Sequence, residues 1–279
     1  MKNAFLFAAA LALSALAACA APLKINGSTT VNLPVAEAAE ILRAEQQLDI
    51  QVDTQGGSAG GISMLGDGLV QVGMSSKPVS AEDRARYPAV QIQETHIGED
   101  AVALIVSKDV WGGGVKALTK GQIKDIYEGR ITNWKDVGGK PQRVAFFNKE
   151  PGRGTWEVFV HWVYGSPKAA PQVSFPEVGG NEETRNKVAG TRGALSQLSA
   201  SWADGKKVFA LGIQMDDGTI VAPTNENIAT KKYPLSRPLF ILTKGEPAGA
   251  AKTLIDFLLS DRGQALVKKH GYLRLKDLQ

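Results

Sequence analysis

Residues 23–54 read LKINGSTTVNLPVAEAAEILRAEQQLDIQVDT, and this stretch carries the pattern that decides the fold. A short apolar run at 23–26 is followed by a loop of small polar residues, an amphipathic stretch over 34–47 and a second apolar run over 48–54. Short apolar runs that alternate with amphipathic segments are typical of α/β proteins with mostly parallel strands. The stretch therefore predicts a strand, a glycine-containing loop, a helix and a second strand.

The same alternation continues to the end of the chain. We expect further helices over about 58–65, 118–128, 155–164 and 181–188, and a long final helix or helix pair over 248–270. Further strands are expected over 69–74, 101–106, 144–147, 208–211 and 239–242. Thr119 and Gln122 have the spacing of a capping box at the start of their helix, and Gly129 is placed to end it.

Composition excludes several classes of protein. The chain has 279 residues, of which 43% are apolar and 22% charged, so it is globular and long enough to bury a large core without a disulfide. Its net charge of +4 is spread without runs, which argues against nucleic acid as a partner. No spacing of histidine, cysteine and carboxylates suggests a metal site, and no phosphate loop for ATP occurs, so we expect neither a metal nor a cofactor.

The first 19 residues have the order of a secretory signal: one lysine, an apolar stretch and then small residues. The apolar part is too short to span a bilayer comfortably. The sequence LAAC at 16–19 resembles the lipobox of bacterial lipoproteins, in which Cys19 would become the lipidated first residue. Ala18-Cys19-Ala20 also satisfies the small-x-small rule for an ordinary signal peptidase. Both readings predict a mature protein in the periplasm or on the outer face of a membrane. In the lipobox reading, a lipid anchor is its only attachment to the membrane.

Three loops of small residues each follow a predicted strand and open a predicted helix. They are Gly27 to Thr30, Gly56 to Gly61 and, with Lys149 just before it, Pro151 to Thr155. Backbone N–H groups at a helix start have no partner in the helix and lie at the positive end of its dipole, so they stabilise an anion. Each loop alone fits a structural turn. Three together at strand ends, where open α/β sheets bind ligands, predict anion binding.

An enzyme is the alternative interpretation of the second loop. Gly56 to Gly60 satisfies G-x-S-x-G, the nucleophile elbow of serine hydrolases, with Ser58 as the nucleophile. The triad would need His270 with Asp256 or Asp261, but these residues share one predicted helical segment, whereas hydrolase partners come from separate loops. We therefore expect no enzyme activity.

Together the loops resemble those of the periplasmic phosphate-binding proteins of ABC importers. The resemblance covers most of the mature chain and rests on these stretches in this order: INGSTTV at 25–31, GSAGGI at 57–62, VGMSS at 72–76, LT at 118–119, IYEG at 126–129, NW at 133–134, EPGRGT at 150–155, YPL at 233–235 and RPL at 237–239. It implies a two-lobed periplasmic-binding-protein fold of type II, with the ligand cleft between lobes joined by hinge strands. The first lobe would comprise 22–103 plus 233–279, and the second 104–232.

The resemblance also implies the binding residues. The phosphate site would be formed by Thr29, Thr30, Ser58, Ser76, Lys149, Arg153, Gly154 and Thr155. Three of these depart from the family pattern: Ser76 stands where an aspartate is usual, Lys149 where an arginine is usual, and Arg153 where a serine is usual. Glu150 or Asp100 could replace the missing carboxylate as a hydrogen-bond acceptor. Without one, we expect phosphate affinity to rise with pH through the second ionisation of phosphate, and sulfate to compete.

The resulting functional hypothesis is capture of inorganic phosphate, or a closely related tetrahedral oxyanion, for an ABC importer. The partners would be the anion and the permease and ATPase subunits of the importer, and we expect a monomer. An oxyanion sensor on the same scaffold, signalling to a membrane partner, is the alternative that the sequence leaves open.

Overall fold

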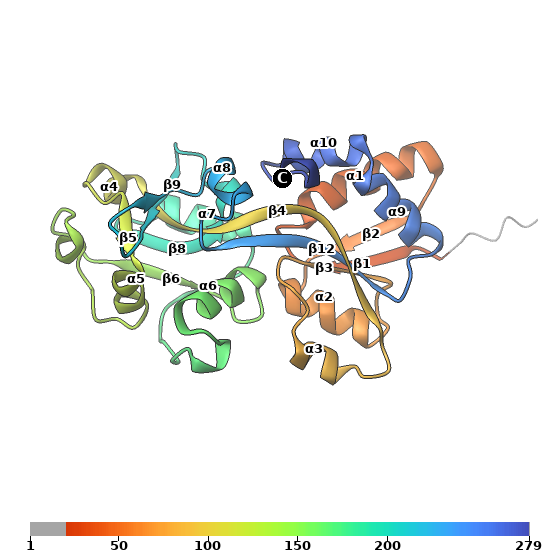
Figure 1. Ribbon diagram of the computed structural model, residues 1–279, viewed down its shortest axis with the longest axis horizontal. Helices are drawn as coiled ribbons and strands as arrows, with labels where there is room; N and C mark the ends of the chain where they lie inside the picture. Colours follow the sequence, from red (N-terminus) through yellow and green to blue (C-terminus); the bar gives the residue numbers. More distant parts are fainter. Residues whose placement is uncertain (1–20, 279) are drawn as a thin grey trace, which may run out of the picture.

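The computed structural model describes residues 21–278 and has an elongated shape with a group of elements at each end (Figure 1). Strands β4 (Ile92–Ser107) and β12 (Ser236–Lys244) run side by side along the long axis and join the two groups. We call the group that holds the beginning of the described chain the first half, and the group built from its middle the second half. The predicted signal segment at 1–19, with Cys19, lies outside the described residues.

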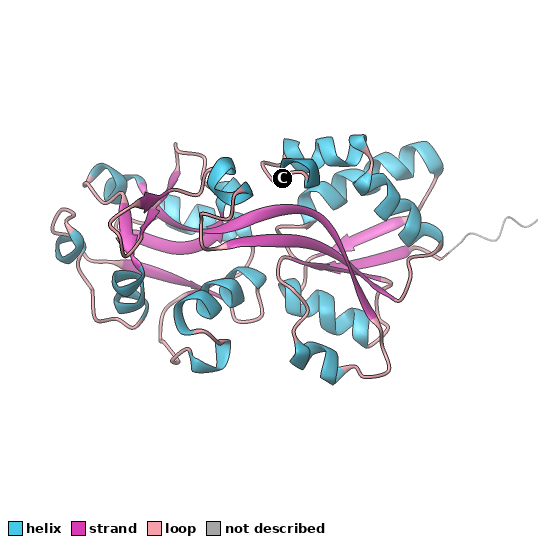
Figure 2. Ribbon diagram, in the orientation of Figure 1, coloured by secondary structure: helices cyan, strands magenta, loops and turns pink. Residues whose placement is uncertain are grey.

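The first half contains three parallel strands covered by helices on both faces (Figure 2). Its elements are β1 (Leu23–Gly27), α1 (Asn32–Gln46), β2 (Ile50–Asp53), α2 (Gly57–Gly66), β3 (Val72–Ser75), α3 (Ala81–Arg86), α9 (Gly249–Leu259) and α10 (Asp261–Lys269). The final helical segment predicted from sequence is a pair, because Ser260 interrupts it and its Oγ accepts a hydrogen bond from the backbone N–H of Gly263.

The second half has more and shorter elements. They are α4 (Lys108–Gly112), β5 (Ala117–Thr119), α5 (Lys120–Tyr127), β6 (Ala145–Lys149), α6 (Gly154–Tyr164), β7 (Glu177–Val178), α7 (Asn181–Gly190), β8 (Ala194–Ser199), β9 (Val208–Ala210), β10 (Gly212–Gln214), β11 (Ile220–Val221) and α8 (Asn225–Ala229). The predicted capping box is confirmed: Thr119 Oγ1 accepts from the N–H of Gln122 at 3.1 Å, and Gln122 Oε1 accepts from that of Thr119 at 2.9 Å.

One nine-stranded sheet runs through both halves, in the order β2-β1-β3-β12-β4-β8-β6-β7, with β9 also paired to β4. The expectation of mostly parallel strands is correct for β1, β2 and β3 and for β6, β7 and β8, but wrong at the junction. There β12 is antiparallel to both β3 and β4, and β8 is antiparallel to β4. The reason is connectivity: the chain that leaves the first half on β4 must return in the opposite direction on β12.

Apolar side chains form separate cores in the two halves. Ile25, Val35 and Leu42 belong to the main cluster of the first half, and Tyr127, Trp134 and other aromatic side chains to that of the second. The two cores are what is expected of two lobes that move relative to one another. The lobe boundaries expected from sequence, after 103 and before 233, fall inside β4 and just ahead of β12, and this division stays a prediction.

Candidate functional site

The loops that follow strands β1, β2, β3 and β6 meet between the two halves. They line a cavity much smaller than the pockets that hold drug-sized ligands. All eight site residues expected from sequence line it. The full lining is Ser28, Thr29, Thr30, Gly57, Ser58, Ser76, Lys149, Arg153, Gly154 and Thr155. The cavity therefore suits a small polar ion rather than a sugar or a nucleotide.

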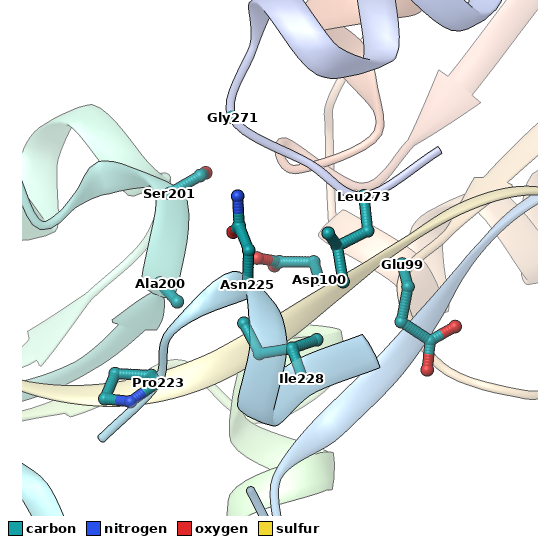
Figure 3. A pocket seen from close by; sticks show the side chains of 9 residues that line it. All are labelled: Glu99, Asp100, Ala200, Ser201, Pro223, Asn225, Ile228, Gly271 and Leu273. Atoms are coloured by element: carbon teal, nitrogen blue, oxygen red, sulfur yellow. The ribbon is translucent and has the colours of Figure 1, made fainter. Parts of the chain in front are cut away.

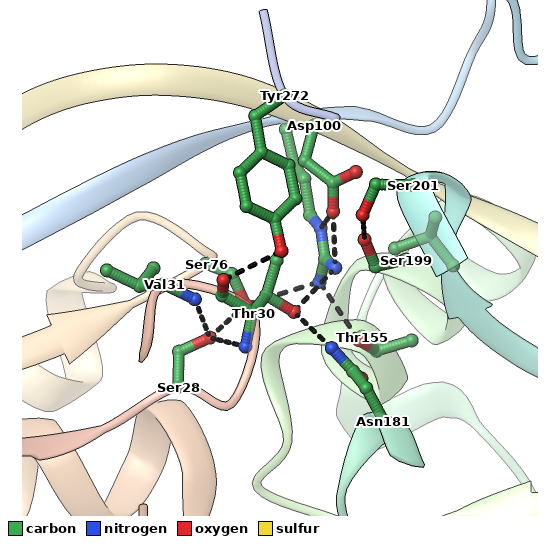
Figure 4. A network of polar contacts seen from close by, with 12 residues as sticks. Ser28, Thr30, Val31, Ser76, Asp100, Thr155, Asn181, Ser199, Ser201 and Tyr272 are labelled. Atoms are coloured by element: carbon green, nitrogen blue, oxygen red, sulfur yellow. Dashed lines mark hydrogen bonds and ion pairs between the residues drawn. The ribbon is translucent and has the colours of Figure 1, made fainter. Parts of the chain in front are cut away.

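The first loop is shaped by a close backbone approach. A Cβ on Gly27, which has φ +143°, would lie 2.2 Å from the carbonyl oxygen of Met74, so only glycine lets β1 and β3 pack here. Next to it, Ser28 Oγ accepts from the backbone N–H groups of Thr30 at 3.2 Å and Val31 at 3.4 Å (Figure 4). These bonds orient the loop so that Thr30 reaches the cavity with its hydroxyl.

Helix starts point at the cavity from both halves. Ser58 is the second residue of α2, and Gly154 and Thr155 are the first two of α6. Backbone N–H groups at these positions have no partner in their own helix and carry partial positive charge. Ser58 and Thr155 are buried, so their donors face an environment in which an unpaired polar group is costly. An anion in the cavity would satisfy donors from both halves at once.

Lys149 lines the cavity, but its ammonium is directed at α7. Its Nζ donates to Thr184 Oγ1 at 2.6 Å, to the Gly180 carbonyl at 3.2 Å and to Asn181 Oδ1 at 3.4 Å. An ammonium has three hydrogens, so these acceptors use them all. Burial, helped by the positive charges of Arg153 and Arg237, lowers the pKa of Lys149 to about 7. Lys149 therefore acts on the cavity through its charge, which titrates near neutral pH.

Arg153 covers the cavity rather than standing in solvent. It is partly buried, and its Nε and Nη2 donate to Glu150 Oε2 at 2.9 and 2.7 Å. Its side chain packs on Gly57 of the first half: a Cβ on Gly57 would lie 2.7 Å from Arg153 Cδ. Glu150 itself does not line the cavity, so in this structure it is not placed to serve as the substitute acceptor considered from sequence.

Three residues of the site were not predicted from sequence: Ser28 and Gly57, which line the cavity, and Arg237, which lies behind its hydroxyls. Arg237 is the charged one of the three. It lies on β12, is 1% exposed, and donates to Asp100 Oδ2 through Nε at 3.1 Å and Nη2 at 2.8 Å. The same guanidinium donates to hydroxyls of the cavity wall: Ser76 at 3.2 Å, Thr155 at 3.0 Å and Thr30 at 3.2 Å. Asp100 is thus engaged as well. The signal available in the sequence was one arginine and one aspartate, each beside an apolar strand, a pattern typical of a buried ion pair.

A second cavity lies on the other face of Asp100. It holds about 290 Å³ of space not filled by atoms, and the side chains of Asp100, Ser201 and Asn225 reach into it (Figure 3). Asp100 therefore separates this polar cavity from Arg237 and the hydroxyls around it.

Direct contacts hold the two halves together around the cavity. The N–H of Ala59 donates to the Gly152 carbonyl at 3.0 Å, and Asn181 Nδ2 donates to Thr30 Oγ1 at 3.0 Å. Next to the lining residue Ser76 in the chain, Lys77 Nζ lies 2.9 Å from Glu157 Oε2 and 2.8 Å from Asp83 Oδ2. Although burial alone would lower the pKa of Lys77, these carboxylates raise it and keep the lysine charged. The structure is therefore a closed form.

The hydrolase alternative lacks a base at Ser58. Ser58 Oγ accepts from the N–H of Ser76 at 3.1 Å and lies 3.4 Å from its Oγ. His270, the histidine that the triad would need, instead lies 2.9 Å from Glu37, and no histidine lines the cavity. The arrangement around Ser58 is suited to donating hydrogen bonds, not to nucleophilic attack.

Neither a metal-binding cluster nor a membrane-spanning helix is found in the part of the chain that the structure describes. Within 21–278, no group of three or more histidine, cysteine, aspartate or glutamate residues is placed to hold a metal ion. Among the same residues, no helix combines the length and apolarity needed to cross a bilayer.

Comparison with known proteins places these features in a family. The model of the PBP superfamily domain matches residues 14–262. The phosphate-binding protein PstS of Bacillus subtilis is 34% identical over 259 residues, which cover 92% of this chain and 82% of the relative. The chain belongs to this family of phosphate-binding proteins. The PstS protein of Borreliella burgdorferi is 26% identical, with 91% of this chain and 90% of the relative covered.

Solved structures of the family have the same fold. A protein of Clostridium perfringens, described as a phosphate ABC transporter substrate-binding protein and determined with bound phosphate, is 32% identical with a TM-score of 0.80, covering 91% of this chain and 99% of that one. An ABC-type phosphate transport receptor of Vibrio cholerae is 29% identical with a TM-score of 0.71, covering 90% and 99%. The family resemblance and the periplasmic-binding-protein fold expected from sequence are confirmed.

Proposed function

We propose that this protein captures inorganic phosphate, or a closely related tetrahedral oxyanion, outside the cytoplasm and presents it to an ABC importer. The observation that carries the proposal is the convergence of two helix starts, five buried hydroxyls and two cationic side chains on one small cavity between the halves, with Arg237 directly behind the hydroxyls. The Clostridium perfringens relative, 32% identical, was determined with phosphate bound.

Capture follows from differential contact. An anion bound to the first half alone meets Thr29, Thr30, Ser58 and Ser76, and only closure adds the N–H groups and hydroxyl at Gly154 and Thr155. A ligand shifts a conformational equilibrium only by the contacts that it makes in one state and not in the other. The anion therefore favours the closed form, and an importer that recognises closure distinguishes the loaded protein from the empty one.

The proposed partners are the permease and ATPase subunits of the importer, and the proposed working form is a monomer with a lipid anchor at Cys19. If Cys19 is lipidated, the native protein partitions into detergent and Cys19→Ala releases it or blocks its processing. An unmodified amino terminus at Ala21, detected by mass spectrometry, would instead identify ordinary signal cleavage.

Calorimetric titration of the mature protein with phosphate, sulfate, arsenate and molybdate tests the proposed function. A hydrogen bond to a charged oxygen contributes about 1.5 to 3 kcal/mol, so Ser58→Ala and Thr155→Ala are each expected to weaken phosphate binding about tenfold to a hundredfold. Thr219→Ala, in an exposed turn far from the cavity, is the matched control and is expected to bind like the wild type. Unchanged affinity in both site variants would mean that the anion binds elsewhere.

Phosphate uptake by cells separates transport from sensing. If the protein works in transport, cells that lack it are expected to lose high-affinity phosphate uptake. If the protein binds phosphate but cells that lack it take up phosphate normally, its role is sensing.

A further inference from the structure

Three hydroxyls at the cavity, those of Thr30, Ser76 and Thr155, accept hydrogen bonds from the guanidinium of Arg237. A hydroxyl oxygen accepts two hydrogen bonds and has one hydrogen to donate. Thr30 Oγ1 accepts from Asn181 Nδ2 at 3.0 Å (Figure 4). It also accepts from Arg237 Nη2 at 3.2 Å, and the two bonds use both lone pairs. Its remaining capacity is the hydrogen, and the space that this side chain faces is the cavity.

Both lone pairs of Ser76 are occupied in the same way, and one lone pair of Thr155. Ser76 Oγ accepts from Arg237 Nη1 at 3.2 Å and from Ser28 Oγ at 3.0 Å. Thr155 Oγ1, from the second half, accepts from Arg237 Nη1 at 3.0 Å. One guanidinium therefore contacts hydroxyls of both halves, and a guanidinium can only donate.

Burial and an ion pair with Asp100 hold the guanidinium of Arg237 in place. Arg237 is 1% exposed, and its Nε and Nη2 both donate to Asp100 Oδ2. Asp100 is itself 3% exposed, and 137 residues separate the pair in the chain. Arg237 does not line the cavity, so it acts on a bound anion through the hydroxyls that it contacts.

We propose that Arg237, held by Asp100, is a positioning residue that makes Thr30, Ser76 and Thr155 donors toward the bound anion and so sets the site's preference for oxyanions that bring no proton. This inference rests on the proposed function, because it concerns the selectivity of the same site. Thr30 and Ser76, whose lone pairs are both occupied, can only donate, which suits the unprotonated oxygens of sulfate, whereas the proton of hydrogen phosphate needs an acceptor. In such a site sulfate competes with phosphate, and Arg237 is the cause.

The test is the ratio of phosphate to sulfate affinity, measured by calorimetry at pH 8. Arg237→Met frees lone pairs on the three hydroxyls, which can then accept the phosphate proton. Phosphate affinity is expected to fall about tenfold to a hundredfold, and sulfate affinity to fall about tenfold further, since sulfate gains nothing from an acceptor. If the single variant Arg237→Met does not fold because Asp100 is left as an unpaired buried charge, the double variant with Asp100→Asn removes both charges and provides the test.

A matched control is Arg262→Met with Glu45→Gln, which removes an exposed arginine–carboxylate pair of the first half. It is expected to leave the ratio unchanged. Wild-type binding of phosphate tests the proposed function itself. Three outcomes would overturn the inference while leaving phosphate capture intact: no sulfate binding by the wild type, loss of both anions by the same factor in the Arg237 variants, or a ratio that moves toward sulfate.

Discussion

Replacing Gly154 by alanine should block closure without disturbing either half. Gly154 opens α6 and lies directly against the hydroxyls of the first half: a Cβ placed on it would be 2.6 Å from Ser76 Oγ and 2.7 Å from Ser58 Oγ. Ordinary contact begins at 3.4 Å, so the two halves would have to separate by about 0.8 Å at this point. Gly154 is not among the glycines with positive φ, so alanine adopts its backbone conformation without strain.

The expected loss of affinity follows from that separation. Hydrogen bonds between the halves, such as the one of 3.0 Å from Ala59 to Gly152, would lengthen to about 3.8 Å, beyond the range in which they form. An anion held by the first half would then lose at least two hydrogen bonds from α6. At about 1.5 to 3 kcal/mol for each bond to a charged oxygen, Gly154→Ala should weaken phosphate binding by at least about a hundredfold.

Calorimetry gives the affinity, and thermal denaturation without phosphate shows whether the fold is intact. The melting temperature of the anion-free variant is expected to equal or exceed that of the wild type, because alanine favours helix. Gly190→Ala, at the end of α7 where an added Cβ would meet no atom of another element within 4 Å, is the control and should leave the phosphate affinity unchanged without lowering the melting temperature. Phosphate binding by Gly154→Ala within about threefold of the wild type would refute the closed-cleft reasoning.

Three further predictions concern charge. Glu157→Gln should weaken phosphate binding about tenfold, because the buried ion pair between Glu157 and Lys77 forms only in the closed form. Lys168→Met, which removes the exposed ion pair with Glu82, should change the affinity little, and equal effects of the two variants would contradict the role of Glu157. Burial and nearby cations lower the pKa of Lys149 to about 7, so binding of sulfate, which does not itself titrate in this range, should raise that pKa and take up a proton. Sulfate affinity should then fall as pH rises above 7, and titration with sulfate at pH 8 in buffers of different ionisation enthalpy should reveal the proton, whereas a buffer-independent enthalpy would contradict it. Ser76→Asp should restore rejection of sulfate, which competition at pH 6 and 8 with sulfate in roughly thousandfold excess would detect; if such an excess leaves phosphate binding by the wild type untouched, another residue provides the acceptor.

The sequence by itself determined the local structure and the chemistry of the loops. Apolar periodicity located most strands and helices, because that periodicity reflects which face of each element is buried. Small residues after strands located the anion-binding loops, because capping and tight turns demand those residue types in any context. The capping box at Thr119 and eight of the ten residues around the cavity were accordingly predicted from patterns that span only a few residues each.

Only the tertiary structure decided how those loops act together. The antiparallel junction of β4 and β12 brings Arg237 to Asp100 and to hydroxyls from both halves, and the closed arrangement brings Lys77 to Glu157. No short-range pattern encodes these pairs. Asp100 and Arg237 lie 137 residues apart and meet through the register of a shared sheet, and Lys77 and Glu157 lie 80 residues apart and meet through the packing of the two halves. A buried charge is visible in a sequence as an isolated ionisable residue in an apolar strand, but its partner is chosen by the fold, because only there does desolvation make pairing necessary.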